Sequence, residues 1–130
     1  LGIQYHKKPY AIAKGWIAIH GDEGSISPHA GLTALTHARK MGFNVICGHT
    51  HRAGQSAFTE ASGGVVRRVH RGVDAGHLMD IKRAHYVSAP NWQQAFQIMT
   101  EDERGVQIDM INIEKDGTFI VHGKRYGRVR

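Results

Sequence analysis

The fold is decided by the stretch Asn44-Val45-Ile46-Cys47-Gly48-His49-Thr50-His51, a short apolar run that ends in a glycine and two histidines. The apolar run is typical of a buried β-strand, and Gly48 allows the backbone to turn where that strand ends. In an extended strand, neighbouring residues alternate between faces, so His49 and His51 would point the same way as an i, i+2 pair. The sequence therefore predicts a strand at 44–47 whose carboxyl end presents two imidazoles.

A second apolar run, Trp16-Ile17-Ala18-Ile19, also ends in a histidine beside a glycine, His20-Gly21. Between the two runs, Ser27-Pro28 is typical of an N-cap followed by a first-turn proline, apolar residues then recur at helical spacing, and Gly42 provides a C-cap. We interpret the segment as strand, helix, strand. A right-handed crossover makes the two strands parallel and brings His20 close to His49.

Three imidazoles at one edge of a sheet are suited to binding a metal ion, and the alternative is that they are ordinary polar side chains. The chain contains 10 histidines in 130 residues, so some close spacings arise by chance. We expect surface or hydrogen-bonded roles for the histidines that have no motif around them: His29, His37, His70, His85 and His122. Histidines that end two apolar strands beside glycines are the stronger candidates for ligands.

The ordered pair Ile19-His20-Gly21 and, one helix later, Gly48-His49-Thr50-His51 resembles the last two signature blocks of the calcineurin-like metallophosphoesterases. The segment Asn91-Trp92-Gln93-Gln94-Ala95-Phe96 and the end of the chain resemble phage-encoded members of that family. The resemblance implies an α/β (α+β) fold: the C-terminal half of a β-sandwich, with strand-helix-strand followed by mostly antiparallel strands.

The same resemblance implies that His20 and His49 bind one metal ion while His51 binds a second. Imidazole ligands suit Mn²⁺, Fe, Zn²⁺ or Ni²⁺. Resembling sequences begin with Asp-x-His, Gly-Asp-x-x-Asp and Gly-Asn-His-Asp/Glu blocks, which supply the bridging carboxylate, an asparagine ligand and the catalytic histidine. None of these blocks occurs before His20. We therefore expect the C-terminal half of such an enzyme, with at most one ion on three histidines and little or no activity by itself.

Two functions from different classes follow from this pattern. The first is a metal-dependent phosphoesterase that hydrolyses phosphodiesters or phosphomonoesters, with Arg52 contacting the substrate phosphate or, equally, forming an ordinary loop salt bridge. The second is a truncated, non-catalytic relative that serves as an oligomeric or host-protein-binding module. Either way, we expect a homo-oligomer or a partner to cover the sheet edge and helix face that the missing half would bury.

Composition and charge favour one small domain, residues 1–130, because the chain is 41% hydrophobic and contains no run long enough to span a membrane. The single cysteine, Cys47, is expected to be a small buried residue, which suits a reducing cytoplasm, that of the host if the protein is phage-encoded. The net charge of +6 and pI of about 9.8 favour a solvated basic surface, with nucleic-acid binding as the alternative. The basic clusters are Arg67-Arg68 with Arg71, Lys82-Arg83, and Lys124 to Arg130.

After residue 51 the pattern changes to strands. Apolar and β-branched runs predict strands at 57–59, 65–69, 92–99, 106–113 and 118–121, with turns at Gly63-Gly64 and Asp116-Gly117. A short helix is expected between Gly76 and Tyr86. Within it, His77 lacks a paired histidine and is not predicted to be a ligand, although it and Asp80 could form a pair that orients one.

Overall fold

The computed structural model describes residues 4–84, 87–88 and 90–127, and it is a mixed α and β structure. The elements follow in the order β1 (Tyr10–Ala13), β2 (Trp16–Ile19), α1 (Leu32–Met41), β3 (Asn44–Cys47), β4 (Ala53–Ser62), β5 (Val65–Ala75), the 3-10 helix η1 (Ile81–Arg83), β6 (Ala95–Glu101), β7 (Val106–Asn112), β8 (Phe119–Val121) and β9 (Lys124–Tyr126). The predicted mixed fold class is confirmed, and so is the order of strand, helix and strand followed by antiparallel strands. The predicted two-sheet sandwich stays a prediction.

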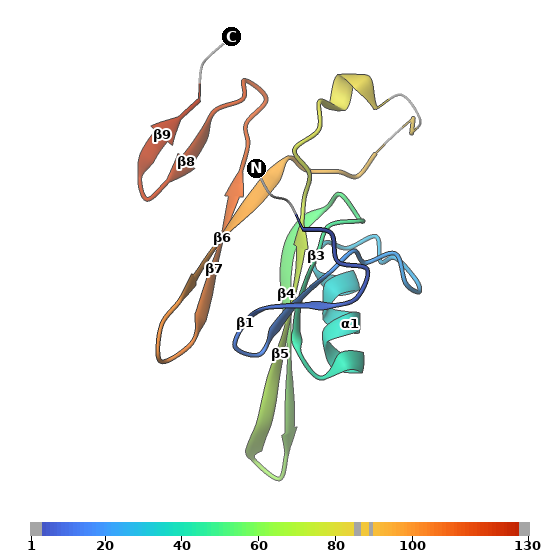
Figure 1. The fold of residues 1–130 in the computed structure, drawn as a ribbon, viewed down its shortest axis with the longest axis vertical. Coiled ribbons are helices and arrows are strands. Elements are labelled where there is room, and N and C mark those ends of the chain that lie inside the picture. Colours follow the sequence, from blue (N-terminus) through green and yellow to red (C-terminus); the bar gives the residue numbers. More distant parts are fainter. Residues whose placement is uncertain (1–3, 85–86, 89, 128–130) are drawn as a thin grey trace.

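A central five-stranded sheet has the strand order β1-β2-β3-β5-β4 (Figure 1). β2, β3 and β5 are parallel, and β1 and β4 are antiparallel strands at the two edges. The register pairs Ile19 with Cys47 and Cys47 with Asp74, so the carboxyl ends of the three parallel strands lie level. The predicted parallel pairing of β2 with β3 is confirmed. Residues that follow these strands meet at one edge of the sheet, where α/β folds place their sites.

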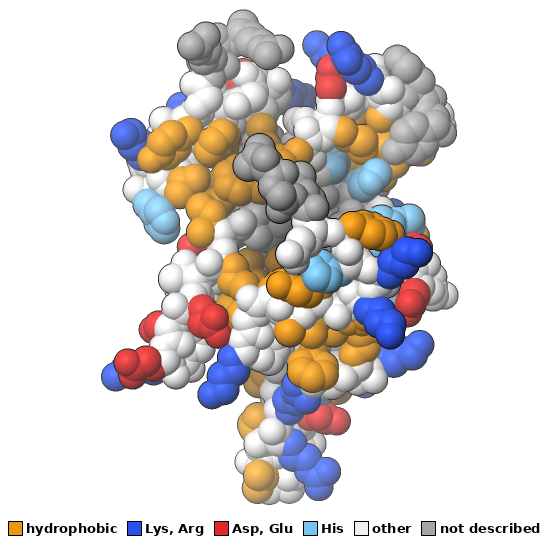
Figure 2. Space-filling model, in the orientation of Figure 1, with side chains coloured by type: hydrophobic (Ala, Val, Ile, Leu, Met, Phe, Trp, Pro, Cys, Tyr) orange, Lys and Arg blue, Asp and Glu red, His pale blue; other side chains and the backbone are white. Residues whose placement is uncertain are grey.

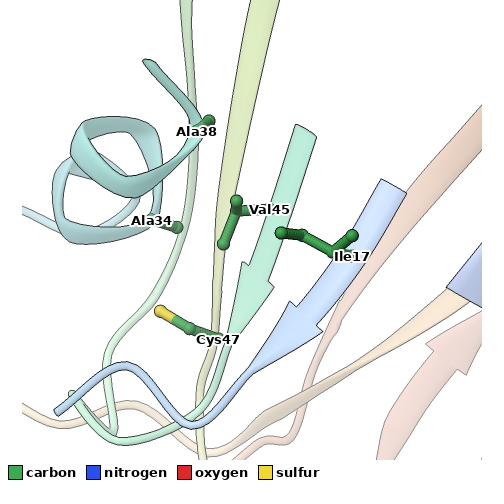
Figure 3. Close-up of a cluster of buried hydrophobic side chains, with 5 residues drawn as sticks. All are labelled: Ile17, Ala34, Ala38, Val45 and Cys47. Carbon is green, nitrogen blue, oxygen red and sulfur yellow. The ribbon is translucent and has the colours of Figure 1, made fainter. Parts of the chain in front are cut away.

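Helix α1 packs against one face of this sheet and forms the core with it. The buried cluster consists of Ile17, Ala34, Ala38, Val45 and Cys47, with the two alanines of α1 facing Val45 on β3 (Figure 3). Small helix residues allow the helix backbone to approach the sheet closely. Gly72 in β5 extends this close approach, because a Cβ at that position would collide with the backbone of Ala34 and Leu35.

The predicted start of the helix at Ser27-Pro28 is wrong, because α1 begins at Leu32 after Gly31, which has a left-handed φ of 81°. Two backbone N–H groups at the start of the helix are satisfied by Asp74, a fully buried carboxylate at the end of β5. Its Oδ2 accepts from the Gly31 N–H at 2.8 Å, and its Oδ1 accepts from the Ala34 N–H at 3.3 Å. A residue some forty positions away therefore caps this helix.

Ser27 caps a local turn instead, since its Oγ accepts from the His29 N–H at 3.1 Å. The other end of the helix agrees with the prediction. Gly42 adopts a left-handed φ of 72°, and its N–H donates to the Ala38 carbonyl at 2.9 Å. Glycine is the usual residue at such a C-terminus because it has no Cβ to strain.

The β4–β5 hairpin confirms the turn at Gly63-Gly64, and both strands are longer than predicted. Its far half extends beyond the rest of the central sheet (Figure 1). Residues 57–68 are exposed there. Only the half of the hairpin near α1 takes part in the core.

The β6–β7 hairpin lies on the side of the central sheet opposite α1 (Figure 1). It touches that sheet through Gln55, whose Nε2 donates to the Ile108 carbonyl at 3.2 Å, and through Glu101, which accepts from the Lys14 N–H at 2.9 Å. These strands confirm the predictions at 92–99 and 106–113. They form a separate two-stranded sheet, and so do β8 and β9.

The connection between β5 and β6 contains η1, and the connection between β7 and β8 contains a turn. The predicted helix between Gly76 and Tyr86 is reduced to η1, and Tyr86 lies outside the described residues. The turn at Asp116-Gly117 is confirmed, with the Gly117 N–H donating to the Glu114 carbonyl at 2.8 Å. Within the described part of the chain, the helices are too short and too polar to cross a bilayer.

Candidate metal centre

His20 and His49 lie together at the carboxyl ends of β2 and β3, as predicted. The His20 carbonyl accepts from the N–H groups of Gly48 and His49, at 3.3 and 3.0 Å, so the two strand ends are bonded to each other. The imidazoles then meet with Nδ1 of His49 3.1 Å from Nε2 of His20 and with ring centroids 4.8 Å apart. His20 is exposed and His49 is half-buried, so the pair is open to ligands.

The 3.1 Å separation has two chemical meanings. It is a hydrogen bond when one of the two facing nitrogens carries a proton. It also fits two nitrogens on one ion, because ligands about 2.0–2.1 Å from a divalent metal lie roughly 2.9–3.4 Å apart at octahedral to tetrahedral angles. The pair can therefore bind one ion once the two rings turn so that both nitrogen lone pairs point at it.

Gly21 allows His20 to lie beside β3. It has a left-handed φ of 96°, and a Cβ there would come within 2.8 Å of the Cys47 Cβ.

Cys47 is buried as predicted, and its Sγ donates to Asp74 Oδ1 at 3.1 Å. Burial, followed by this hydrogen bond, raises the pKa of the thiol far above its ordinary value. Cys47 is therefore a neutral structural residue and supplies no thiolate.

His51 does not continue the extended strand, so the predicted i, i+2 pairing with His49 on one face of a strand is wrong. β3 ends at Cys47, and the His51 N–H donates to the Gly48 carbonyl at 3.1 Å, which closes a turn. His51 has a φ of 56°, a left-handed conformation that costs a non-glycine residue about 1–2 kcal/mol. Residues strained in this way cluster at functional sites.

The turn directs His51 towards two residues that sequence analysis did not predict to be ligands. Its ring packs edge-on against Trp92, with centroids 4.9 Å apart, and against His77, with centroids 5.9 Å apart. Burial lowers the pKa of His51, and the nearby imidazoles of His49 and His20 lower it further. The three predicted ligands are therefore close enough to repel one another when protonated.

His77, which the sequence suggested only as a possible partner of Asp80 in orienting a ligand, lies at the site. Its side chain is only 8% exposed, and no described residue makes a geometrically complete hydrogen bond to either ring nitrogen. Burial lowers the pKa of His77, repulsion from His51 lowers it further, and a weak hydrogen bond with the Met79 backbone opposes the shift. The suggested partner Asp80 instead accepts from the Lys82 N–H at 3.1 Å. No local pattern reveals this position, because its neighbours come from distant segments.

Arg52 directly follows His51 in the sequence, and its guanidinium group already makes one hydrogen bond. Its Nη1 donates to the Ser27 carbonyl at 2.9 Å, and among the described residues its buried Nε has no acceptor. The predicted contact with a substrate phosphate stays a prediction.

A cavity of about 490 Å³ opens beside His20, with Lys7, Lys8 and Asp22 among its lining residues. Within residues 4–84, 87–88 and 90–127, no three His, Cys, Asp or Glu side chains form a ready-made metal site.

The basic clusters do not gather at this site. Arg67 and Arg68 lie in the outer half of β5, Lys82 and Arg83 in η1, and Lys124 and Arg125 in β9. Figure 2 shows Lys and Arg side chains at several separate places on one face of the molecule. This spread favours the predicted solvated surface, while residues 128–130 lie outside the described part.

Comparison with known proteins shows similarity to phage proteins. The chain is 34% identical to the Gene 54 protein of Mycobacterium phage L5 over 127 residues, which cover 95% of this chain and 49% of that protein. It is 35% identical to the Gene 54 protein of Mycobacterium phage D29 over 118 residues, which cover 88% of this chain and 46% of that protein. The chain thus spans about half the length of the curated relatives it matches, and the expected similarity to phage-encoded proteins is confirmed. No protein-family model matches the chain. No solved structure matches it either.

Proposed function

We propose that this chain is the C-terminal, metal-binding portion of a metal-dependent phosphoesterase. The observation that carries the proposal is the 3.1 Å separation between the ring nitrogens of His20 and His49 at the ends of neighbouring parallel strands. The resemblance to the calcineurin-like metallophosphoesterases gives these histidines to one ion and His51 to a second. The strand-helix-strand unit has the order and direction that this resemblance requires.

The donor set decides which metals fit. The available groups are imidazoles, because the Cys47 thiol is buried and bonded to Asp74. Imidazoles suit Mn²⁺, Fe, Zn²⁺ and Ni²⁺. The lowered pKa of His51 keeps that ring neutral near pH 7, and only a neutral imidazole binds a metal. A bound divalent ion would activate a water molecule and neutralise the phosphate oxygens of an ester.

Two imidazoles are fewer ligands than either ion of a binuclear centre requires. The matched phage proteins are about twice as long as this chain. We propose that the carboxylate and amide ligands, and the catalytic histidine, come from a segment like the part of those proteins that this chain does not match. For this chain alone we expect one weakly bound ion at most. Arg52 would orient the phosphate once its bond to Ser27 is exchanged for the substrate.

Metal titration of the chain tests the proposal. Isothermal titration with Mn²⁺ or Zn²⁺ is expected to show about one ion per chain, with binding lost in His49→Ala and retained in His29→Ala. His29 is the matched control because it is an exposed histidine that is not one of the predicted ligands. Hydrolysis of bis-p-nitrophenyl phosphate is measured on the same samples. Equal binding by the wild-type chain and His49→Ala would refute the assignment.

A second candidate function is a non-catalytic oligomeric or host-protein-binding module. It is favoured by the edge strand β1, on which Tyr10 and Ile12 are 47% and 36% exposed. An exposed apolar edge strand is a template for pairing with another chain. Sedimentation of the wild-type chain and of Ile12→Lys distinguishes the two candidates. This module predicts an oligomer that the lysine dissociates and no metal binding that depends on His49.

A further inference from the structure

Among the described residues, the Met79 backbone lies within hydrogen-bonding reach of the His77 imidazole, and no partner pairs both ring nitrogens. A buried polar group without a hydrogen bond costs about 1–3 kcal/mol, so nearly all such groups in native proteins are paired. The side chain of His77 is more than nine-tenths buried, and within the described part of the chain both ring nitrogens lack a complete hydrogen bond. The position therefore calls for a polar neighbour that completes it.

The backbone holds His77 beside His51. Gln93 connects the two segments, because its N–H donates to the His51 carbonyl at 3.0 Å and its carbonyl accepts from the His77 N–H at 3.2 Å. Gly76, which precedes His77, is bonded in turn to the Arg52 carbonyl at 2.7 Å. These ties run between three segments that are distant in the sequence. They fix which side chain His77 meets.

The two rings lie close to hydrogen-bonding distance. Their centroids are 5.9 Å apart, and the ring planes meet at 60°. An N–H···N bond of about 3 Å between two imidazoles places the centroids roughly 5.2–5.5 Å apart, so the rings need to approach by less than 1 Å. Trp92 contacts both rings and limits the directions in which they can move.

We propose that His77 is a positioning residue for His51, accepting the N–H of the His51 nitrogen that does not face the metal. The inference rests on the proposed function, which makes His51 a ligand. Metal-binding histidines usually donate their second N–H to a fixed acceptor, and this bond sets the tautomer and the orientation of the ring. A buried, neutral imidazole provides one acceptor nitrogen. His77 thus selects which nitrogen of His51 is free to bind an ion.

Tautomer measurement on the metal-free chain tests the inference without activity. Long-range ¹H–¹⁵N spectra above pH 8 are expected to show His51 as one tautomer in the wild-type chain. His77→Phe, which keeps the ring shape but has no acceptor, should leave a mixture of tautomers, and His77→Asn should restore one tautomer through its amide oxygen. A mixture in the wild-type chain, or one tautomer in His77→Phe, would overturn the inference.

A matched control tests the contact between His77 and His51, and a metal titration tests the proposed metal-binding function separately. His70→Phe replaces another buried histidine, one that is bonded to Glu60, and should leave the His51 tautomer unchanged. A shift as large as that of His77→Phe would mean that core packing alone sets the tautomer, which overturns the inference. Co²⁺ added to the wild-type sample should broaden the imidazole signals of His20 and His49. No broadening refutes the proposed function, whereas the tautomer result alone decides the contact between His77 and His51.

Discussion

Replacing Asp74 by alanine removes a carboxylate that joins the start of α1 to β5 and to Cys47, at the end of the strand that leads to His49. Asp74 is fully buried and accepts from three donors: the Gly31 N–H, the Ala34 N–H and the Cys47 thiol. Alanine leaves all three donors without an acceptor in a space that the packed core closes to water. The variant therefore tests whether this residue defines where α1 begins.

The expected loss follows from the number and kind of these bonds. A hydrogen bond to a charged acceptor contributes about 1.5–3 kcal/mol, and the loss of an N-cap costs about 0.5–2 kcal/mol. The thiol bond is the weakest of the three, and bonds that share one acceptor are not additive. We expect Asp74→Ala to lower the free energy of unfolding by about 3–5 kcal/mol, out of a total of roughly 5–15 kcal/mol for such a domain.

Urea unfolding followed by far-ultraviolet circular dichroism measures this loss. At a slope of about 1.5 kcal/mol per molar urea, the midpoint should fall by roughly 2 M or more. Asp102→Ala is the matched control, because Asp102 also accepts two backbone N–H groups but lies exposed in a turn. Its loss should stay below about 1 kcal/mol, since water replaces exposed bonds. A loss below 1 kcal/mol in Asp74→Ala as well would refute the capping role.

Three further perturbations test separate parts of the fold. Gly72→Ala should lower the unfolding midpoint strongly because its Cβ meets the backbone of α1, whereas Gly105→Ala, which points into open space, should not. His122→Asn should raise the free energy of unfolding by about 0.5 kcal/mol, because His122, at a φ of 48°, occupies a hairpin position that favours asparagine. Acid should destabilise the metal-free chain from about pH 6.5 downwards. Burial lowers the pKa values of His51 and His77 below 6.5 in the folded chain, so as the pH falls the unfolded chain binds protons at these residues before the folded chain does. Unfolding curves between pH 5 and 8 check this slope, which should become shallower in His77→Asn and would contradict the reasoning if it stayed the same.

The part of the site that the sequence predicted is the part built from neighbouring elements. His20 and His49 follow strands that a single helix connects, so apolar runs, glycines and the handedness of the crossover were enough to bring them together. The start of α1 could not be predicted in this way. Ser27-Pro28 has the local pattern of a helix start. The cap position is instead Gly31, four residues later, because its N–H finds an acceptor in Asp74 on β5. Tertiary contacts override local preference wherever such a buried partner exists.

The surroundings of His51 lay beyond local patterns for the same reason. Sequence analysis treated His49 and His51 as a pair on one strand face, because residues two apart in a strand point to the same side. The structure separates them. His49 turns to His20 across the sheet edge, while His51, in its left-handed conformation, turns to Trp92 and His77. Nothing in the sequence around either partner indicates that it meets His51.

His49 and His51 depend on different parts of the fold, so a metal centre that uses both would be assembled in two steps. The pair His20–His49 depends only on β2, α1 and β3, which pack around one core and are bonded to each other at the strand ends. His51 depends on backbone ties to Gln93, more than forty residues later. If the two histidines serve two ions, as proposed, each ion has its own structural support. The first ion site then forms with the central sheet, and the second forms only when the segment that carries Trp92 has packed against the turn.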